Sequence, residues 1–190
     1  MAAAATALLV VDMVNDFIMP ESPIHVPGAI GIIPSVIRAV EIARQRGMLV
    51  VWAMREHDKY GRDVELFRRP FYANGNGPVT KGTKGAHLVD GLEIEEADYK
   101  VVTSRMSAFF ATNLHLVLQA SGIKSLVVVG VQTPNCIRQT AFEAVSWDYQ
   151  PVTVLTNATA AATPQIHAAN LLDMRNIGIK TITLEEWAQL

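Results

Sequence analysis

Apolar and polar residues alternate along this chain in blocks that predict a repeating strand–helix pattern. Short, nearly continuous apolar runs are typical of strands buried on both faces of a sheet. Six such runs are present: Thr6–Val11, Met48–Met54, Tyr99–Ser104, Ser125–Val129, Val152–Leu155 and Ile179–Ile182. Helix-like segments separate most of them. We therefore expect an α/β fold, with a parallel sheet covered by helices on both faces, forming one domain over residues 1–190.

The expected helices are marked by apolar spacing and by capping residues. Apolar side chains recur every three or four positions from Ile33 to Ala43, and Gly47 is suited to end that helix. Threonine is a good N-cap, and proline is favoured at the first helical position that follows it. On these grounds further helices are expected after Thr112, Thr133, Thr163 and Thr183, the last in a capping box with Glu186.

Residues 55–97 interrupt the repeat. They are polar, irregular and rich in glycine and proline. A stretch of this length inside a compact domain is typical of a functional loop region. Its charged part, residues 57–65, is expected to be mostly solvated. Arg68 and Arg69, beside Phe71 and Tyr72, are expected at a substrate pocket or a subunit contact, and we favour the contact.

Composition narrows the class of protein. Half of the residues are hydrophobic, 18% are charged and the net charge is −2, which favours a compact soluble protein without nucleic-acid or anionic-membrane partners. One cysteine excludes an internal disulfide framework and a cysteine-rich zinc site. The run Ala2–Val11 lacks a basic leader, so we expect a first strand rather than a signal peptide, and a cytoplasmic location. No apolar stretch approaches the ~20 residues of a membrane span.

Polar residues follow the first four strands, where ligands bind in open α/β sheets. They are Asp12, Arg55–His57, Thr103–Arg105 and Cys136. Cys136 falls in the first turn of the helix expected after Thr133, where the helix dipole favours an anion. We therefore predict that its thiol loses a proton readily and acts as a nucleophile, with Asp12 as proton acceptor. The alternatives are an inert core cysteine and an aspartate that starts a solvated turn.

Three segments, in this order, resemble the isochorismatase-like cysteine hydrolases: Leu9–Phe17, Ser107–Leu114 and Gly130–Arg138. The last is similar to that family's nucleophile loop, Gly-Val-x-Thr-Asn-x-Cys-Val, and the match spans nearly the whole chain. The resemblance implies a doubly wound sheet of order 3-2-1-4-5-6. It also implies an Asp–Lys–Cys triad that hydrolyses small amides or, in some members, a vinyl ether.

In that comparison Asp12 is the acid/base and Cys136 the nucleophile. The resemblance also implies a cis peptide bond between Val131 and Gln132, and an oxyanion hole made by the backbone N–H groups of Gln132 and Cys136. A dimer or larger homo-oligomer is expected from the family and from the high hydrophobic content.

The sequence departs from the family at the lysine. Four residues before Ser107 stands Thr103, which offers a hydrogen bond but no positive charge. Lys100 does not replace the lysine simply, because on a strand it lies about 10 Å away and on the opposite face. Either the site is damaged, or the charge comes from another residue, for which the candidates are Arg55, Arg105, Lys81 and Lys84.

A second departure bears on metal and substrate. Nicotinamidases of the family bind a metal through an Asp-x-His pair after the second strand, and Arg55 stands at the place of that aspartate. A permanent cation repels a divalent ion, so we expect no metal and no cofactor. The planar guanidinium of Arg55 suits a substrate carboxylate, and its alternative is a surface salt bridge with Glu56 or Asp58. The other expected substrate-binding residues are Gln132, Phe17 and Arg105, although Phe17 is also a typical core residue.

The sequence therefore predicts an isochorismatase-like hydrolase that cleaves a C–N bond of a small amide or carbamoyl compound through the Cys136 thiolate. The substrate is expected to be small and, because of Arg55, anionic. The alternative is a catalytically silent relative that binds a small molecule or a protein partner. Thr103 is the residue that favours this alternative.

Overall fold

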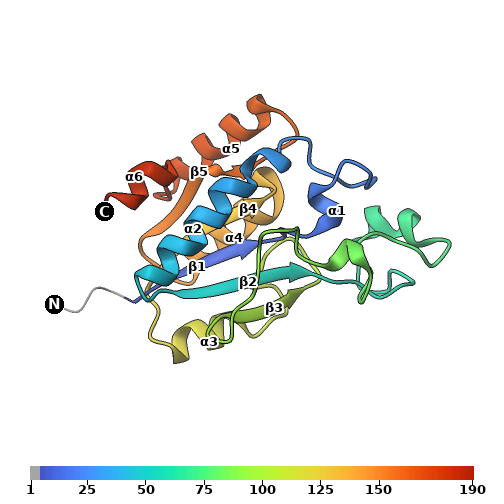
Figure 1. Ribbon diagram of the computed structural model, residues 1–190, viewed down its shortest axis with the longest axis horizontal. Coiled ribbons are helices and arrows are strands. Elements are labelled where there is room, and N and C mark those ends of the chain that lie inside the picture. Colours follow the sequence, from blue (N-terminus) through green and yellow to red (C-terminus); the bar gives the residue numbers. More distant parts are fainter. Residues whose placement is uncertain (1–4) are drawn as a thin grey trace.

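The computed structural model describes residues 5–190, in which one parallel sheet forms the centre of the fold (Figure 1). The strand order is β3-β2-β1-β4-β5-β6, and all neighbouring strands are parallel, which confirms the predicted fold class and order. The strands are β1 (Thr6–Val11), β2 (Leu49–Arg55), β3 (Tyr99–Thr103), β4 (Ser125–Val131), β5 (Val152–Ala160) and β6 (Lys180–Ile182). Residues 2–4 of the predicted first apolar run lie outside the described part.

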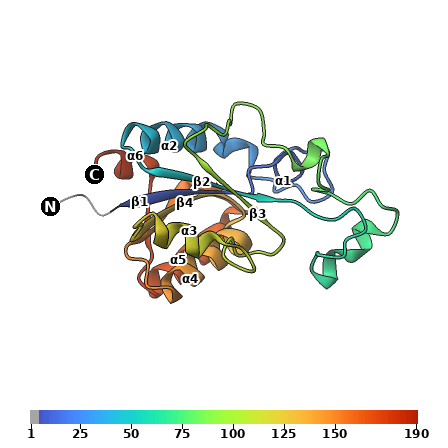
Figure 2. The ribbon, with the colours of Figure 1, turned by 90° about the horizontal axis from the view of Figure 1, so that it is seen from below.

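Helices cover both faces of this sheet, with α2 and α6 on one face and α3, α4 and α5 on the other (Figure 2). The helices are α1 (Asn15–Ile18), α2 (Ile33–Gln45), α3 (Leu114–Ala120), α4 (Arg138–Ser146), α5 (Pro164–Asn176) and α6 (Leu184–Ala188). Shorter helical turns are η1 (Ile30–Ile32), η2 (Leu66–Tyr72), η3 (Lys84–Ala86) and η4 (Thr133–Ile137). No helix within residues 5–190 combines the length and apolar character needed to cross a membrane.

Alternate residues of each strand enter different cores, as a pleated strand with two covered faces requires. Leu8, Val10 and Trp52 belong to the core under α2 and α6. Leu9, Val11 and Ala53 belong to the core under α3, α4 and α5, which also contains Cys136. The position of a residue along its strand therefore decides whether its side chain lies on the same side of the sheet as Cys136.

Two of the four predicted N-cap residues cap their helices. Thr163 caps α5, and Thr183 forms the predicted capping box with Glu186. Two caps are wrong. Helix α3 begins at Leu114 after Asn113, so Thr112 lies just outside it. Thr133 is the first residue of η4 rather than its cap, and its hydroxyl instead forms a hydrogen bond of 2.8 Å with Nδ1 of His167.

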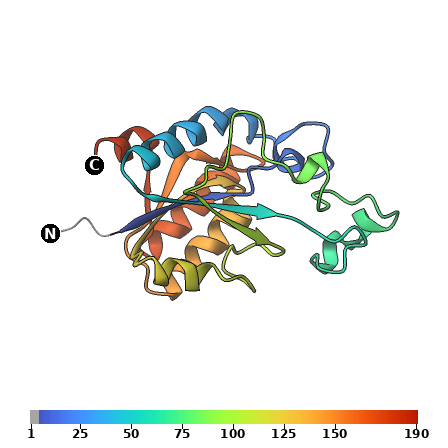
Figure 3. The ribbon, with the colours of Figure 1, turned by 60° about the horizontal axis from the view of Figure 1, so that its bottom comes forward.

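Residues 56–98, between β2 and β3, form a long excursion that projects from the carboxyl ends of the strands (Figures 1 and 3). Its regular structure is limited to η2 and η3, in agreement with the predicted irregular region. Val64, Tyr72 and Val79 are buried and anchor it, whereas Leu66 and Phe67 are 75% and 61% exposed. The excursion thus combines an exposed part around Leu66 and Phe67 with a later part that contributes Val89 and Leu92 to the core.

Gly130 on β4 is required by the close approach of β1. Its φ is +111°, and a Cβ there would lie 2.1 Å from the carbonyl oxygen of Val11. We predict that Gly130→Ala lowers the free energy of unfolding by about 3 kcal/mol or more, because strand β1 must move away. Urea denaturation measures this. The matched control is Gly31→Ala, where a Cβ meets nothing within 4 Å; equal stability losses in both variants would contradict the prediction.

Candidate active site

Three strands and one helical turn bring the predicted residues together at the carboxyl edge of the sheet. Asp12 follows β1 directly, with a left-handed φ of 52°, and its N–H still donates to the Ala53 carbonyl at 2.8 Å. Arg55 is the last residue of β2, and Thr103 is the last residue of β3. Cys136 lies in η4, which follows β4 after the cis peptide bond between Val131 and Gln132. The predicted cis bond is thereby confirmed.

Arg55 and Thr103 occupy equivalent places on neighbouring strands. Their Cα atoms are partners in the β2–β3 ladder, and both residues are buried. Each lies two residues after a strand residue, Ala53 or Val101, whose side chain is in the core containing Cys136, so both side chains are on that side of the sheet. Lys100 pairs instead with Trp52, which faces the other core, and its Nζ lies 2.7 Å from Glu56 on an exposed surface. The prediction that Lys100 lies on the opposite face is therefore confirmed.

The guanidinium of Arg55 joins the candidate nucleophile to the candidate base. Its Nη2 lies 3.2 Å from Sγ of Cys136 and 3.4 Å from Oδ2 of Asp12. All three side chains are almost completely buried. Oδ1 of Asp12 and Oγ1 of Thr103 have no hydrogen-bond partner among the described residues. Arg55 thus places a positive charge beside Cys136, and Asp12 keeps one acceptor oxygen unoccupied.

Burial dominates the acid–base properties of this group. It raises the pKa of the Cys136 thiol, and the negative charge of Asp12 raises it further, against the opposing effect of Arg55. Burial also raises the pKa of Asp12, which Arg55 and Cys136 counteract. The prediction that a helix start makes the Cys136 thiol more acidic is therefore wrong for the resting site, because desolvation disfavours the thiolate more strongly.

Arg55 itself remains a cation. Burial alone would lower its pKa, but the adjacent acidic groups, Asp12 first and Glu65 among them, outweigh that effect and raise it. Neither of the surface partners considered for it contacts it, since Glu56 pairs with Lys100 and Asp58 with Arg62. Arg55 is therefore part of the buried cluster and not of a surface salt bridge.

Sequence reasoning missed the role of Glu65 in the excursion. Its Oε1 lies 3.3 Å from Nη1 of Arg55, and its Oε2 lies 3.2 Å from Nε of Arg68. Glu65 was expected on a solvated face, and Arg68 at a subunit contact, yet the Glu65 side chain is only 14% exposed and Arg68 is buried. The available signal was the i,i+3 spacing of Glu65 and Arg68, which suits an ion pair in a helical turn.

The other predicted site residues lie farther from the reacting groups. Phe17 is buried below the guanidinium of Arg68, whose Cζ is 5.8 Å from the ring centre. Arg105 donates to the carbonyl of Ser104 and has no recorded contact with Asp12 or Cys136. Gln132 is half-buried, and Lys81 and Lys84 are exposed. Among the four candidate sources of charge, Arg55 is the one shown in contact with both Asp12 and Cys136.

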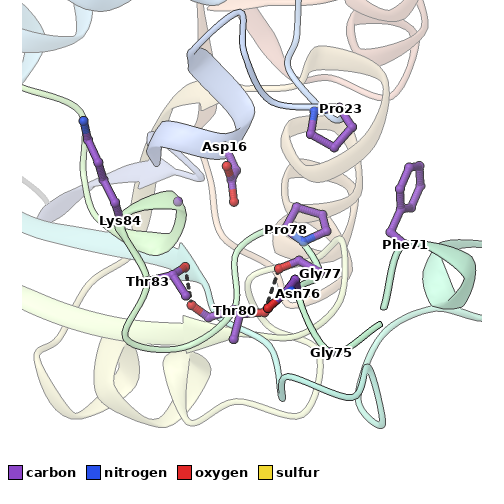
Figure 4. Close-up of a pocket in the computed structure, with 11 residues that line it drawn as sticks. Asp16, Pro23, Phe71, Gly75, Asn76, Gly77, Pro78, Thr80, Thr83 and Lys84 are labelled. Atoms are coloured by element: carbon purple, nitrogen blue, oxygen red, sulfur yellow. Dashed lines mark hydrogen bonds between the residues drawn. The ribbon is translucent and has the colours of Figure 1, made fainter. Parts of the chain in front are cut away.

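Several cavities are lined by residues of the excursion, including one with Glu65 and one with Phe71 in its lining. The first, of about 220 Å³, is lined by Glu65, Arg105, Ser107, Phe110 and Glu143, among others, and so opens beside the Arg55–Glu65 pair. The second, of about 400 Å³, is lined by Asp16, Phe71 and residues 75–85 in part (Figure 4). The carboxylate of Asp16 in that second cavity accepts a hydrogen bond from the Val79 N–H at 2.6 Å. Neither lining includes Asp12, Arg55 or Cys136, and the first cavity is related to them through the contact of Glu65 with Arg55.

The residues present do not suit a divalent metal ion. Arg55 brings a buried positive charge to the end of β2, which repels a divalent ion, and Nδ1 of His57 lies 3.3 Å from Asp63. Within residues 5–190, no group of three or more His, Cys, Asp or Glu side chains is arranged to hold a metal.

Comparison with known proteins places the chain in a family. The Isochorismatase domain family matches residues 6–186, and the chain belongs to it. It is 64% identical, over 97% of its length and 95% of the relative's, to a protein of Arabidopsis thaliana named a probable inactive nicotinamidase. It is 28% identical, over 88% of its own length and 78% of the relative's, to a maleamate amidohydrolase of Pseudomonas putida strain KT2440.

The solved structures agree with this assignment. The crystal structure of an isochorismatase family protein from Desulfovibrio vulgaris subsp. vulgaris strain Hildenborough has a TM-score of 0.96 to this chain, at 37% identity and 98% coverage of both chains. The chain therefore has the fold of this family as well as its sequence features.

His57 at the base of the excursion is predicted to make stability depend on pH. Burial, then the charge of Arg55, lower its pKa from 6.5 to about 4, against the effects of Asp63 and Glu65. Between these values the unfolded chain binds more protons, so stability falls as the pH falls from about 6.5 to 4. We expect the parent to lose up to about 3 kcal/mol more than His57→Gln over this range, measured by urea denaturation. Identical pH profiles of the two proteins would contradict this.

Proposed function

We propose that this protein hydrolyses a C–N bond of a small amide or carbamoyl compound, with Cys136 as nucleophile and Asp12 as proton acceptor. The contact of one buried guanidinium with both Cys136 and Asp12 is the observation that carries this proposal. In it, Arg55 supplies the positive charge that Thr103 lacks. A buried charge acts strongly on its neighbours, because little water screens it.

The reaction begins from a neutral thiol. As Sγ of Cys136 bonds to the substrate carbonyl carbon, its proton passes to Asp12, and Arg55 stabilises the negative charge that develops on sulfur. Backbone N–H groups of Gln132 and Cys136 stabilise the oxyanion. Asp12 then gives its proton to the leaving nitrogen as the C–N bond breaks, which leaves a thioester. Water attacks the thioester while Asp12 accepts a proton from it. The C–S bond then breaks, Asp12 returns the proton to Sγ of Cys136, and the acid product leaves.

The family and one relative support the amide class. The Pseudomonas relative is named for hydrolysis of an amide, and the C–N bond is the bond broken in that class of reaction. The Arabidopsis relative, at 64% identity, is named a probable inactive nicotinamidase. Nicotinamide is therefore not the substrate we propose, and that name also supports the silent alternative. We propose that the protein acts on another small amide. We also propose that it forms a homo-oligomer.

A catalytically silent binding protein is the second candidate. The observations that favour it are the neutral Thr103 at the lysine position and the complete burial of Cys136, which raises the pKa of its thiol. The two candidates differ in whether Cys136 forms a covalent bond with a substrate.

Cys136→Ala is predicted to abolish hydrolysis of a panel of small primary amides and carbamoyl compounds, because no other thiol is present. Released ammonia measures turnover, and intact-protein mass spectrometry of the parent, quenched during turnover, detects the acyl group on Cys136. The control is Ser146→Ala, a surface helix position away from the site. Undiminished turnover by Cys136→Ala would rule out the nucleophile, and a parent inactive on the whole panel would favour the silent protein.

The position of the positive charge can be tested by moving it. Arg55→Gln is predicted to lower kcat/KM by roughly 100- to 1,000-fold, because the thiolate and the transition state lose their adjacent cation. Adding Thr103→Lys to Arg55→Gln is predicted to restore much of the activity, since residue 103 is the ladder partner of residue 55 on the same face. The same amide assay measures both variants.

Lys100→Gln is the matched control for that experiment, because it removes a cation from β3 on the opposite face. It should leave kcat/KM within about twofold of the parent. Full activity of Arg55→Gln would show that the charge of Arg55 is not used. If the double variant turns over an amide that the parent does not, the parent site is silent.

A further inference from the structure

We infer that Arg55 and Arg68 form a binding subsite for a small carboxylate ligand, and that Glu65 occupies this subsite when no ligand is bound. The inference names the substrate class of the proposed active site and in that respect rests on the proposed function. The ligand is thus a small molecule with one carboxylate, and its reacting carbon lies close enough to that carboxylate to reach Cys136.

The first support is the way Glu65 is held. Its two carboxylate oxygens lie 3.3 Å from Nη1 of Arg55 and 3.2 Å from Nε of Arg68. A carboxylate between two guanidinium groups is the arrangement by which arginine recognises carboxylate ligands. Glu65 therefore shows where the carboxylate of a ligand would be held.

The second support is the incomplete pairing of this cluster. Oε2 of Glu65, Nε of Arg68 and Nε of Arg55 are buried without a hydrogen bond of good geometry among the described residues. Buried polar groups are normally satisfied, and each one that is not costs about 1–3 kcal/mol. Glu65, fixed to the backbone of the excursion, thus fits the two arginines imperfectly. A free carboxylate is not tethered in this way and can orient to satisfy them.

The third support is the balance of charge. Arg55 and Arg68 bring two positive charges to a buried place, and ionised Asp12 and Glu65 bring two negative ones. Removing Glu65 without replacement leaves an uncompensated buried cation, which costs several kcal/mol. A carboxylate ligand preserves the balance, whereas a neutral ligand does not. The exchange therefore favours anions.

Position completes the argument. Glu65 lines the cavity of about 220 Å³ and also contacts Arg55, whose other nitrogen contacts Sγ of Cys136. Glu65 is thus linked to the nucleophile through a single residue, Arg55. It lies between buried Val64, which anchors the excursion, and exposed Leu66, so its side chain can turn away while Val64 stays packed. A ligand carboxylate that takes its place is led to the nucleophile.

Alkylation of Cys136 by a matched pair of reagents tests the inference. Iodoacetate and iodoacetamide react by the same step: sulfur bonds to the CH₂ carbon, the C–I bond breaks, iodide leaves, and the thiol proton passes to Asp12 or solvent. They differ in the carboxylate. Because Cys136 is the one cysteine, intact-protein mass spectrometry follows its alkylation directly. The ratio of the two rates cancels any change in the fraction of thiolate.

Glu65→Gln is expected to raise the iodoacetate-to-iodoacetamide rate ratio about tenfold over that of the parent, because two buried cations then lack a carboxylate. Adding Arg68→Gln to this variant should return the ratio toward the parent value. Glu143→Gln is the matched control: it removes a carboxylate from the same cavity, but one without a recorded contact to Arg55. Its ratio should stay within about twofold of the parent. If Glu65→Gln does not fold, Glu65→Asp, which keeps the charge but shortens the reach, should raise the ratio to a smaller extent.

Equal acceleration of both reagents by Glu65→Gln would overturn the inference, because it would show loosening of the excursion without an anion site. An unchanged ratio, or the same rise in Glu143→Gln, would overturn it as well. Alkylation needs no amide turnover. A parent that hydrolyses no amide but shows the charge-selective ratio would therefore contradict the proposed hydrolysis alone, and turnover without that ratio would contradict the subsite alone.

Discussion

The buried guanidinium of Arg55 is the constraint on which the arrangement of the site depends. A buried cation costs several kcal/mol unless opposite charges and hydrogen-bond acceptors surround it. Here those partners come from three separate parts of the chain: Asp12 after β1, Cys136 in η4 and Glu65 in the excursion. Satisfying one side chain at the end of β2 therefore fixes the position of a strand end, a helical turn and a long loop relative to one another. The same contacts give the candidate nucleophile its charged neighbour.

Much of the fold could be predicted because its signals are local. Continuous apolar runs marked the six strands, and Thr163 and Thr183 marked helix starts through side chains that reach their own next turn. The site was less predictable. Sequence placed Asp12, Arg55 and Cys136 at strand ends, but whether Arg55 turned inward or toward Glu56 depended on the folded excursion. The acidity of Cys136 was misjudged for a similar reason, because burial is a property of the whole structure and outweighs the local helix start.

Thr103 illustrates a limit of comparing motifs residue by residue. Compared with the family motif, which has lysine at this position of β3, the chain lacks a cation. In the structure, however, Arg55 on the neighbouring strand β2 is the ladder partner of Thr103 and supplies a cation beside Cys136. Adjacent strands lie about 4.8 Å apart, a distance that a long arginine side chain spans easily. What the chemistry of such a site requires is a positive charge beside the sulfur, and more than one backbone position can deliver it. The relevant comparison between relatives is therefore the location of charge in space.

The uneven anchoring of the excursion has a thermodynamic consequence. Its later part is held firmly, because Val89 lies in the core and the Asn15 N–H donates to the His87 carbonyl. Residues 66–76 are mostly exposed and lie beside the Glu65 ion pairs, while the sheet is packed on both faces. Such a segment opens with a smaller free energy than the whole domain, so it behaves as a separate unit of local unfolding. The lifetime of the contact between Glu65 and Arg55 is then set by that local equilibrium, and substitutions in the core that change global stability leave it largely untouched.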